Sequence, residues 1–455
     1  MPVAISRRQF LRGCSTTIAA MAGARLTRLA FAASATANDE ILVVVFLRGG
    51  WDALNVVPPL AGPDRALYEQ ARPNLRVAAA GPGAALSLDG QFGLHPSLAA
   101  LYPLYQAQRL AVVHAVGLTT DTRSHFDAMQ FMELGTPGVK TTATGWLTRH
   151  LQTAANLPPN VVFPALSAGG TTAMSLLGTA DAVAMSSPSG FRLDGAWNLI
   201  DEQRAALRDL YTPGDLSDWL RRAGTETLDT IDLVEQSALG TYIPANGAQY
   251  PAGSFGDNLR AVAQLIKMDL GLQVATVDLG GWDTHEYQGD NAGGYLAERL
   301  QELALGLAAL YTDLDGGCGQ GYARRTTVVV MSEFGRRLRE NANHGTDHGH
   351  GSAMFVLGGS VRGGHVYGGW PGLATGQLYD GYDLAVTTDY RRVLSDILTR
   401  RLGQPTANLS AIFPGYAGYT PLEIVADAFP PPLVPAGPHR VYLPTLTQGI
   451  GPSCP

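Results

Sequence analysis

Carboxylate and imidazole side chains gather in one glycine-rich stretch of the chain, directly after a strand-like run. Glu333 follows the β-branched segment 326–331, and Asp347, His348 and His350 come shortly afterwards. A buried strand that leads into a loop with Asp and His is typical of metal ligation at the edge of an α/β sheet. We therefore predict that this region contributes ligands to a metal site.

Two earlier strand-like segments end in the same way. Asp52 follows the segment 41–47 after two glycines, which let the backbone come close to a ligand. Asp283 and His285 follow the segment 273–279. On its own, an Asp-x-His sequence is weak evidence for a metal site, because Asp also caps turns and His also occurs on protein surfaces. The candidate metal ligands are Asp52, Asp283, His285, Glu333, Asp347, His348 and His350.

This set contains too many ligands for one tetrahedral ion and about the right number for two. A mixture of imidazoles and carboxylates favours zinc, manganese or iron over calcium. Two ions a few Å apart usually clamp the attacking and leaving oxygens of a phosphoryl-type transfer. The expected cofactor is therefore a divalent metal, present as one or two ions.

Ser124 lies between the strand-like segment 110–116 and a helical pattern over 128–133. A serine at this position caps the helix with its hydroxyl. Alternatively, it is a nucleophile at a helix N-terminus, where the dipole and the free N–H groups favour an anion. The spacing leaves both interpretations open. Arg336, close to Glu333, is a candidate anion-binding residue.

The elements that must position these residues are mostly apolar, as expected of strands covered on both faces. Leucines recur at steps of three and four between 296 and 314, which predicts one buried helix face. Strand, helix and strand at this spacing predict an α/β fold with a doubly wound, largely parallel sheet and helices on both faces. The predicted strands are 41–47, 110–116, 273–279, 326–331 and 353–357.

The N-terminal segment has the pattern of an export signal. Arg7 and Arg8 precede Phe-Leu, a mildly apolar stretch follows, and Ala-x-Ala cleavage options lie near Ala35 and Ala37. This pattern predicts a twin-arginine signal peptide, with the translocase as partner and the periplasm as destination. A basic amphipathic helix is the alternative. The predicted organisation is a signal over 1–37, an α/β domain over 38–428 with a cap-like insertion at about 157–251, and a proline-rich tail over 429–455.

Composition excludes several classes of protein. The 455 residues are 45% hydrophobic and 16% charged, which suits a globular enzyme and not a coiled coil or a disordered chain. Removing residues 1–37, with five arginines and no acid, would take the net charge from −7 to −12 and disfavours nucleic acid as a partner. No apolar run reaches the ~18 residues that span a bilayer. Cys318 and Cys454 remain, and their pairing is open.

The order of these residues resembles that of the alkaline phosphatase superfamily, in which a first Asp is followed by a Ser or Thr nucleophile that opens a helix. An Asp with a nearby His, an Asp-His pair and a last His come next. More closely, the chain is similar to the bacterial "domain of unknown function 1501" family within that superfamily. The matching stretches are 46–52, 123–126, 281–285, 332–336 and 345–349, extended by 358–368 and 388–391.

The resemblance implies an alkaline-phosphatase-like fold and a metal-dependent hydrolase of phosphate or sulfate esters. Ser124 would be the nucleophile, Arg123 or Arg336 would hold the substrate oxyanions, and His125 would donate a proton or act as a further ligand. A formylglycine-type sulfatase is disfavoured, because neither Ser124 nor Cys318 begins a C/S-x-P-x-R motif.

One departure from the superfamily pattern supports a second hypothesis. Where the superfamily has Asp-His, this chain has Glu333 followed by Phe334, so one imidazole is missing. The alternative is therefore a non-catalytic periplasmic protein that keeps the fold and binds a partner or a surface polymer.

Overall fold

The computed structural model describes residues 38–428 except 158–160, 162–163, 180, 194–198, 212–218, 238–240, 291–292 and 318. The predicted signal over 1–37, the predicted tail over 429–455, Cys318 and Cys454 lie outside the described residues. The proposed domain boundaries therefore stay predictions.

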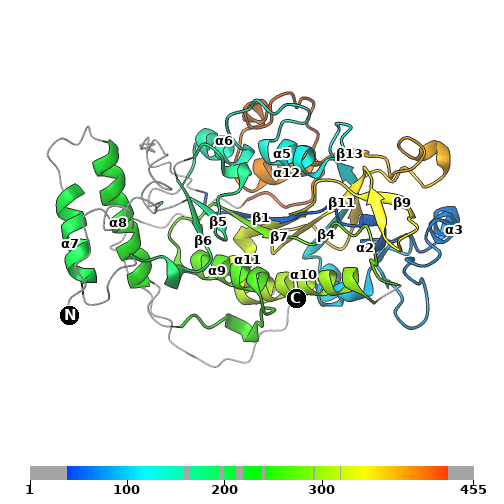
Figure 1. Ribbon diagram of the computed structural model, residues 1–455, viewed down its shortest axis with the longest axis horizontal. Helices are drawn as coiled ribbons and strands as arrows, with labels where there is room; N and C mark the ends of the chain where they lie inside the picture. The colour runs from blue at the N-terminus through cyan, green and yellow to red at the C-terminus, as the bar shows by residue number, and fades with distance from the viewer. Residues whose placement is uncertain are drawn as a thin grey trace.

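A large mixed sheet, mostly parallel, forms the centre of the molecule (Figure 1). Its strands are β1 (Ile41–Leu47), β4 (Leu110–Gly117), β5 (Ala165–Ala168), β6 (Ala182–Met185), β7 (Val274–Leu279), β8 (Thr326–Met331), β11 (Ser352–Gly358), β12 (Val366–Tyr367) and β13 (Thr388–Asp389). The order is β12-β4-β11-β8-β1-β7-β5-β6, with β13 paired to β4. Only β11 runs antiparallel to its neighbours β4 and β8 among these paired strands.

All five predicted strands are present, with ends that differ by one residue at most. The expectation of an α/β fold with a largely parallel sheet is confirmed. Two small antiparallel pairs lie outside the main sheet. They are β2 (Leu86–Ser87) with β3 (Gly93–Leu94), and β9 (Arg336–Glu340) with β10 (Thr346–His348).

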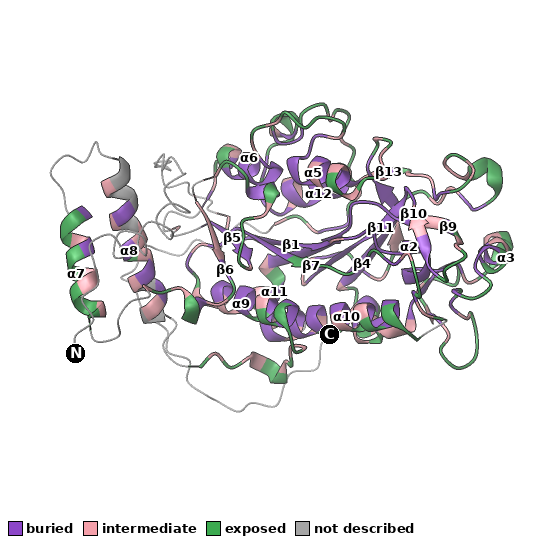
Figure 2. Ribbon diagram, viewed as in Figure 1, coloured by how far each residue is buried: buried purple, intermediate pink, exposed green. Residues whose placement is uncertain are grey.

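Helices cover both faces of the sheet, and the alternation of side chains along β1 shows why. Residues 41, 43, 45 and 47 pack in one apolar cluster with the long helices of one face, whereas residues 42, 44 and 46 pack with those of the other. Figure 2 shows the strands buried between the two layers. The described helices are α2 (Ala53–Val56), α3 (Gly62–Ala71), α4 (Tyr102–Gln106), α5 (His125–Leu134), α6 (Trp146–Thr153), α7 (Ile200–Tyr211), α8 (Trp219–Ser237), α9 (Ser254–Met268), α10 (Tyr295–Leu314), α11 (Tyr322–Arg325), α12 (Tyr390–Arg400) and α13 (Leu409–Ile412).

Helices α9 and α10 lie on one face, and α5, α6 and α12 lie on the other (Figure 1). The leucine repeat between 296 and 314 is the buried face of α10, as predicted. Burial of such an apolar stripe against a sheet is the main stabilising contribution of a surface helix.

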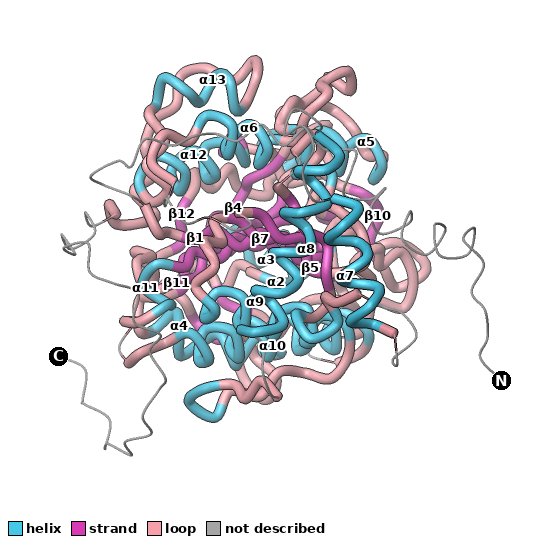
Figure 3. The backbone as a smooth tube through the Cα atoms, turned by 90° about the vertical axis from the view of Figure 1, so that its left-hand side faces the viewer, coloured by secondary structure: helices cyan, strands magenta, loops and turns pink. Residues whose placement is uncertain are grey.

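The segment 157–251, which was expected to cap the active face, instead contributes to the sheet. Its strand β5 pairs with β7 and β6 extends the same edge. Helices α7 and α8 lie at the end of the molecule away from β9 and β10 (Figure 1), and Figure 3 shows them in front of that edge. The helices described in this segment therefore extend the fold at its far end and do not cover β9 and β10.

The parallel strands bring their carboxyl ends to one edge. Phe46 of β1 pairs with Met331 of β8, and Leu47 pairs with Leu279 of β7, so these three strands end at the same level. The loops that follow them carry the predicted site residues, as expected for an open α/β sheet. No helix in the described ranges combines the length and apolar composition that crossing a membrane requires.

Candidate metal centre

Three imidazoles meet one carboxylate at this edge of the sheet. The Nε2 atoms of His125, His285 and His348 lie 3.3, 3.1 and 3.2 Å from Asp283 Oδ1. His125 begins α5, Asp283 and His285 follow β7, and His348 ends β10. The set His125, Asp283, His285 and His348 is called the His–Asp cluster below.

Each histidine of the cluster uses its other ring nitrogen to hydrogen-bond an oxygen acceptor. His125 Nδ1 donates to Glu333 Oε1 at 2.6 Å, and His285 Nδ1 lies 3.3 Å from Asp347 Oδ1. His348 Nδ1 donates to the carbonyl oxygen of Arg123 at 2.7 Å. Because these partners only accept hydrogen bonds, each Nδ1 carries the proton and each Nε2 of a neutral ring carries a lone pair.

Three lone pairs directed at an anionic oxygen repel one another unless a positive charge lies between them. His125 Nε2 is buried and forms no hydrogen bond of acceptable geometry with any residue that the structure describes. His285 Nε2 and His348 Nε2 lie 2.8 Å apart. Ligand atoms about 2.0–2.1 Å from a tetrahedral zinc ion are about 3.3 Å from one another, close to these separations. The ligand atoms of His125, Asp283 and His348 all lie within 4.8 Å of one another, so this donor set fits one divalent cation.

The electrostatics of the site also favour a positive charge. Burial alone would lower the pKa of His125, but its hydrogen bond to Glu333 and the negative charges of Glu333 and Asp283 hold this pKa above its ordinary value. Partial burial would raise the pKa of Asp283, but Arg336 holds it at about 2. The carboxylate is therefore ionised at neutral pH and available as a ligand.

The cluster is open to solvent on one side. The side chains of Asp283 and His285 are 48% and 39% exposed, whereas that of Glu333 is fully buried. An accessible metal position beside buried supporting groups is the arrangement of catalytic and not of closed structural sites.

The supporting carboxylates are themselves fixed. Glu333 Oε1 accepts the backbone N–H of Gly49 at 2.8 Å, and its Oε2 accepts the Ser332 hydroxyl at 2.9 Å. Asp347 Oδ1 accepts Asn341 Nδ2 at 3.0 Å, and this hydrogen bond is the main reason why the pKa of Asp347 is lowered. Glu333 and Asp347 thus orient histidines of the cluster, and no sequence signal separated this role from ligation.

Gly49 shows why the glycines after β1 are needed here. It adopts φ +125°, and a Cβ at this position would lie 2.5 Å from the backbone nitrogen of Asp283. Only glycine tolerates both the backbone conformation and this approach. The loop after β1 therefore packs directly against the loop that carries Asp283 and His285.

Arg336 is buried and holds the loops of the site together. Its guanidinium donates to the carbonyl oxygens of Gly49, Gly50 at 2.5 Å, Thr346 at 2.9 Å and Trp282 at 3.1 Å, and to Asp283 Oδ1 at 2.7 Å. The side chain is not exposed to a substrate in this arrangement. Its contacts are those of a residue that positions Asp283.

Two of the predicted ligands lie apart from the cluster. Asp52 is fully buried, and its Oδ2 accepts Arg72 Nη1 and Gln288 Nε2, both at 2.6 Å. His350 stacks on Tyr379 with a centroid distance of 4.1 Å. The structure therefore brings together Asp283, His285 and His348 of the predicted ligands, with Glu333 and Asp347 behind them.

Arg123 and Ser124 lie beside the cluster, because the Arg123 carbonyl holds His348 and the next residue after Ser124 is His125. Ser124 Oγ accepts the Asp127 N–H at 3.4 Å as the cap of α5 and is exposed. Arg123 Nη2 donates to Asp383 at 2.6 Å and to Asp380 at 3.3 Å, and its side chain is 30% exposed. No sequence pattern points to Asn341 or Asp383, because their roles depend on contacts that form only in the folded chain.

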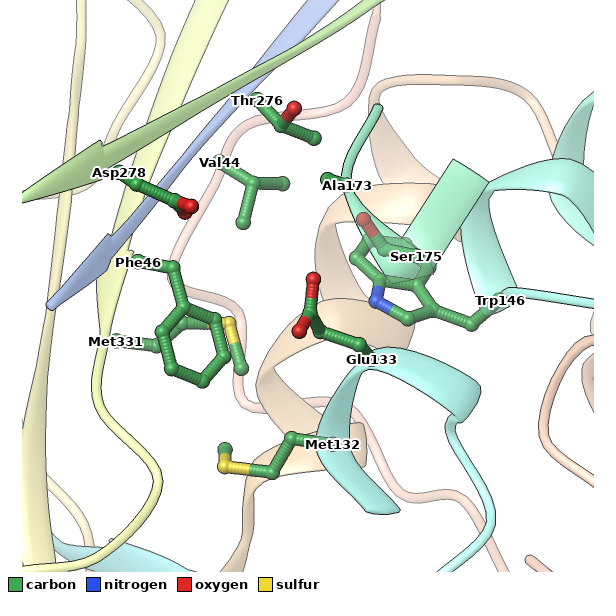
Figure 4. Close-up of a pocket in the computed structure, with 10 residues that line it drawn as sticks. All are labelled: Val44, Phe46, Met132, Glu133, Trp146, Ala173, Ser175, Thr276, Asp278 and Met331. Carbon is green, nitrogen blue, oxygen red and sulfur yellow. The ribbon is translucent and has the colours of Figure 1, made fainter. Parts of the chain in front are cut away.

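A small cavity lies elsewhere, between α5, α6 and the sheet (Figure 4). Glu133 and Asp278 point toward it, and both pair with Arg48. None of the residues that line it belongs to the His–Asp cluster. It is therefore separate from the candidate metal centre.

Residues 225–413 match the family model described as "Protein of unknown function (DUF1501)". The recognition of this family from sequence motifs is confirmed over that segment. Comparison with curated proteins gives no match. Among solved structures, the chain is similar to one described as a protein in the alkaline phosphatase superfamily from Vibrio parahaemolyticus, with 11% identity and a TM-score of 0.28 over 78% of this chain and 69% of that one.

Proposed function

We propose that this chain, whose residues 225–413 match the DUF1501 family, binds one divalent cation in the His–Asp cluster and hydrolyses phosphate or sulfate esters there. The observation that carries the proposal is the hydrogen bonding of the three Nδ1 atoms. It leaves three Nε2 atoms directed at one carboxylate oxygen, an arrangement that a cation stabilises.

A single ion accounts for the geometry better than two. Asp52 already neutralises Arg72, and His350 packs on Tyr379. In the part of the chain that the structure describes, the grouping of His125, Asp283 and His348 is the one that offers converging ligand atoms. A mixture of imidazole and carboxylate ligands suits zinc, manganese or iron.

When bound, a divalent ion supplies positive charge that polarises an ester and lowers the pKa of a hydroxyl nucleophile. Ser124 is the proposed nucleophile. Its Oγ would form the bond to phosphorus or sulfur while the ester oxygen leaves as the alcohol with the proton that Oγ loses. Water then releases phosphate or sulfate and restores the serine. Arg123, partly exposed beside Ser124, would bind the oxygens of the group that is transferred.

The test combines elemental analysis with an assay of phosphomonoesters, phosphodiesters and sulfate esters. We expect about one divalent ion per chain and turnover of at least one ester class. Metal-free protein that is inert across the panel would contradict the proposal. Bound metal without turnover would favour a non-catalytic binding protein.

Two variants separate the roles of Ser124. Ser124→Asn keeps a good N-cap and removes the nucleophile, whereas Ser124→Ala removes both. We expect activity to be lost in both variants and thermal stability to fall only in Ser124→Ala. Full activity of Ser124→Asn would leave the serine with the capping role alone.

We further propose that the protein is exported to the periplasm by the twin-arginine translocase, on the basis of Arg7 and Arg8. Replacement of both by lysine keeps the charge and removes the recognised pair. Fractionation of cells should then find the protein in the cytoplasm. Unchanged periplasmic recovery of this variant would contradict the proposal.

A further inference from the structure

A second group of charges is connected to the His–Asp cluster through Arg123 and is centred on Asp383. This carboxylate is fully buried, and its Oδ2 accepts Nε and Nη2 of Arg123 at 3.1 and 2.6 Å. Arg123 Nη2 also donates to Asp380 Oδ2 at 3.3 Å. The side of a guanidinium that carries Nε and Nη2 can form paired hydrogen bonds with an oxyanion. In this structure carboxylates occupy it, so Arg123 cannot bind a substrate with that side while it pairs with Asp383.

Release of Arg123 would leave Asp383 as a buried charge without its partner. Breaking a buried ion pair is strongly unfavourable, because the remaining charge is neither hydrated nor neutralised. Arg123 itself has room to move, since its side chain is partly exposed and can rotate without displacing the backbone carbonyl that holds His348. The use of Arg123 at the candidate site therefore requires another counter-charge for Asp383.

Arg337 is placed to supply that charge. Its Nε lies 3.8 Å from Asp383 Oδ1, which is beyond hydrogen-bond distance. Both atoms are buried, and neither has a hydrogen-bond partner among the residues with described positions. Buried polar atoms without partners are rare in folded proteins, and here a donor and an acceptor remain unpaired close to each other.

The backbone holds Arg337 and Asp383 side by side. The two residues form an antiparallel bridge, and the Leu338 N–H donates to the Tyr382 carbonyl oxygen at 3.1 Å. The Arg337 guanidinium lies 5.2 Å from the centroid of the Tyr382 ring, a contact that stabilises a cation. A small movement of the Arg337 side chain would therefore bring Nε to Oδ1 and leave the backbone in place.

We propose that Arg123 and Arg337 exchange as the counter-charge of Asp383. Without substrate, Arg123 pairs with Asp383. When an ester binds, Arg123 turns to the oxygens of the group that is transferred, and Arg337 closes on Asp383. Arg337 is thus a positioning residue that acts through Arg123. The inference rests on the proposed function, in which Arg123 binds these oxygens.

Binding of inorganic phosphate and sulfate, the products of the two ester classes, tests the exchange without requiring turnover. Calorimetry on Zn²⁺-loaded protein would compare Arg337→Gln with Arg339→Gln, which removes the same charge from an exposed side chain two residues further along β9. We expect Arg337→Gln to weaken binding of the anion about 10-fold and Arg339→Gln to have a much smaller effect. Arg337→Lys keeps the charge and should recover part of the loss. Equal losses in Arg337→Gln and Arg339→Gln would show a general effect of charge and overturn the exchange.

Combination with Asp383→Asn separates the exchange from other roles of these residues. This variant removes the charge that retains Arg123, so anion affinity should rise about 3- to 10-fold. In that background Arg337→Gln should have no further effect. Additive effects of the two substitutions, or weaker anion binding by Asp383→Asn, would overturn the exchange.

The outcome for the native protein distinguishes this inference from the proposed function. Native protein that binds phosphate or sulfate, with variants that contradict the exchange, would leave the proposed function intact. Failure of the native protein to bind either anion would overturn both. Because Arg337 is partly exposed, its variants decide the question even if Asp383→Asn does not fold.

Discussion

Asp52 and Asp283 follow two neighbouring strands, β1 and β7, and both are aspartates after a glycine-rich turn. Asp52 is fully buried and is neutralised by Arg72 and by the Gln288 amide. Asp283 is half exposed, and three histidine Nε2 atoms surround its Oδ1 in addition to Arg336. The residue type and its place after a strand are the same. The charge and protonation of the partners make Asp52 structural and leave Asp283 available as the proposed ligand.

The strongest test of this difference is Asp283→Asn. An amide oxygen is a weaker ligand than a carboxylate, and the amide cannot balance the charge of a divalent ion. We expect metal binding and ester hydrolysis to be lost. The free energy of unfolding of the metal-free protein should also fall, because Asp283 is the carboxylate that pairs with the buried guanidinium of Arg336. Metal content, measured after dialysis, checks the outcome. A variant that keeps a full equivalent of metal would remove Asp283 from the ligand set.

The converse variant is Asp52→Asn. It leaves the buried guanidinium of Arg72 without a counter-charge, and breaking a buried pair in this way costs about 3–5 kcal/mol. We expect urea denaturation to show that loss, while the folded protein retains its metal. Loss of the metal at unchanged stability would instead identify Asp52 as a ligand.

Histidines show the same difference between buried structural groups and partly exposed groups of the site. His114 and His150 lie in the core, apart from the His–Asp cluster. Burial lowers the pKa of each to about 4. His114 Nε2 donates to the Val57 carbonyl and its Nδ1 accepts the Ala115 N–H, so protonation at Nδ1 would break a hydrogen bond. His150 Nδ1 accepts from Gln404 Nε2.

The pKa values of His114 and His150 are lower in the folded chain than in the unfolded chain. As pH falls through the window from 6.5 to 4, the unfolded chain therefore binds more protons than the folded chain. Their contribution to stability is complete above this window and is lost below it. We expect a loss of about 2 kcal/mol for each between pH 7 and pH 5. Urea titrations at both pH values check this result, and His150→Gln should reduce the pH dependence. An unchanged midpoint at pH 5 would contradict the account.

The smallest expected effect is that of Glu333→Gln. The amide oxygen can still accept from His125 Nδ1, but the carboxylate charge that strengthens the imidazole as a ligand is gone. We expect metal affinity to fall about 10-fold. Competition with a chelator measures it, and His125→Ala should cause a much larger loss. If the two variants lose equal affinity, Glu333 is a ligand and not an orienting group.

Much of the fold was predictable from local patterns. The segments 41–47 and 326–331 are mostly apolar and rich in β-branched residues, and each forms a strand with those bounds. Strand β5, by contrast, consists of Ala165–Ala168 within a run of small residues, which has no period that indicates a strand. Its pairing with β7 depends on a contact across more than a hundred positions, so local patterns alone place the segment in an insertion.

The site was predictable in its residue types and not in their roles. Asp283, His285 and His348 could be selected because each follows or lies near a strand end. The division between ligand and orienting group depends on which nitrogen of each ring meets an acceptor. Asp52 could not be set apart, because Arg72 and Gln288 approach it only after the chain has folded.

X-ray absorption spectroscopy of the metal-loaded protein tests the central claim most directly. The account predicts one divalent ion per chain, with imidazole nitrogens as most of its protein ligands and a carboxylate oxygen as another. The absence of bound metal, or a ligand shell made of oxygen alone, would contradict it.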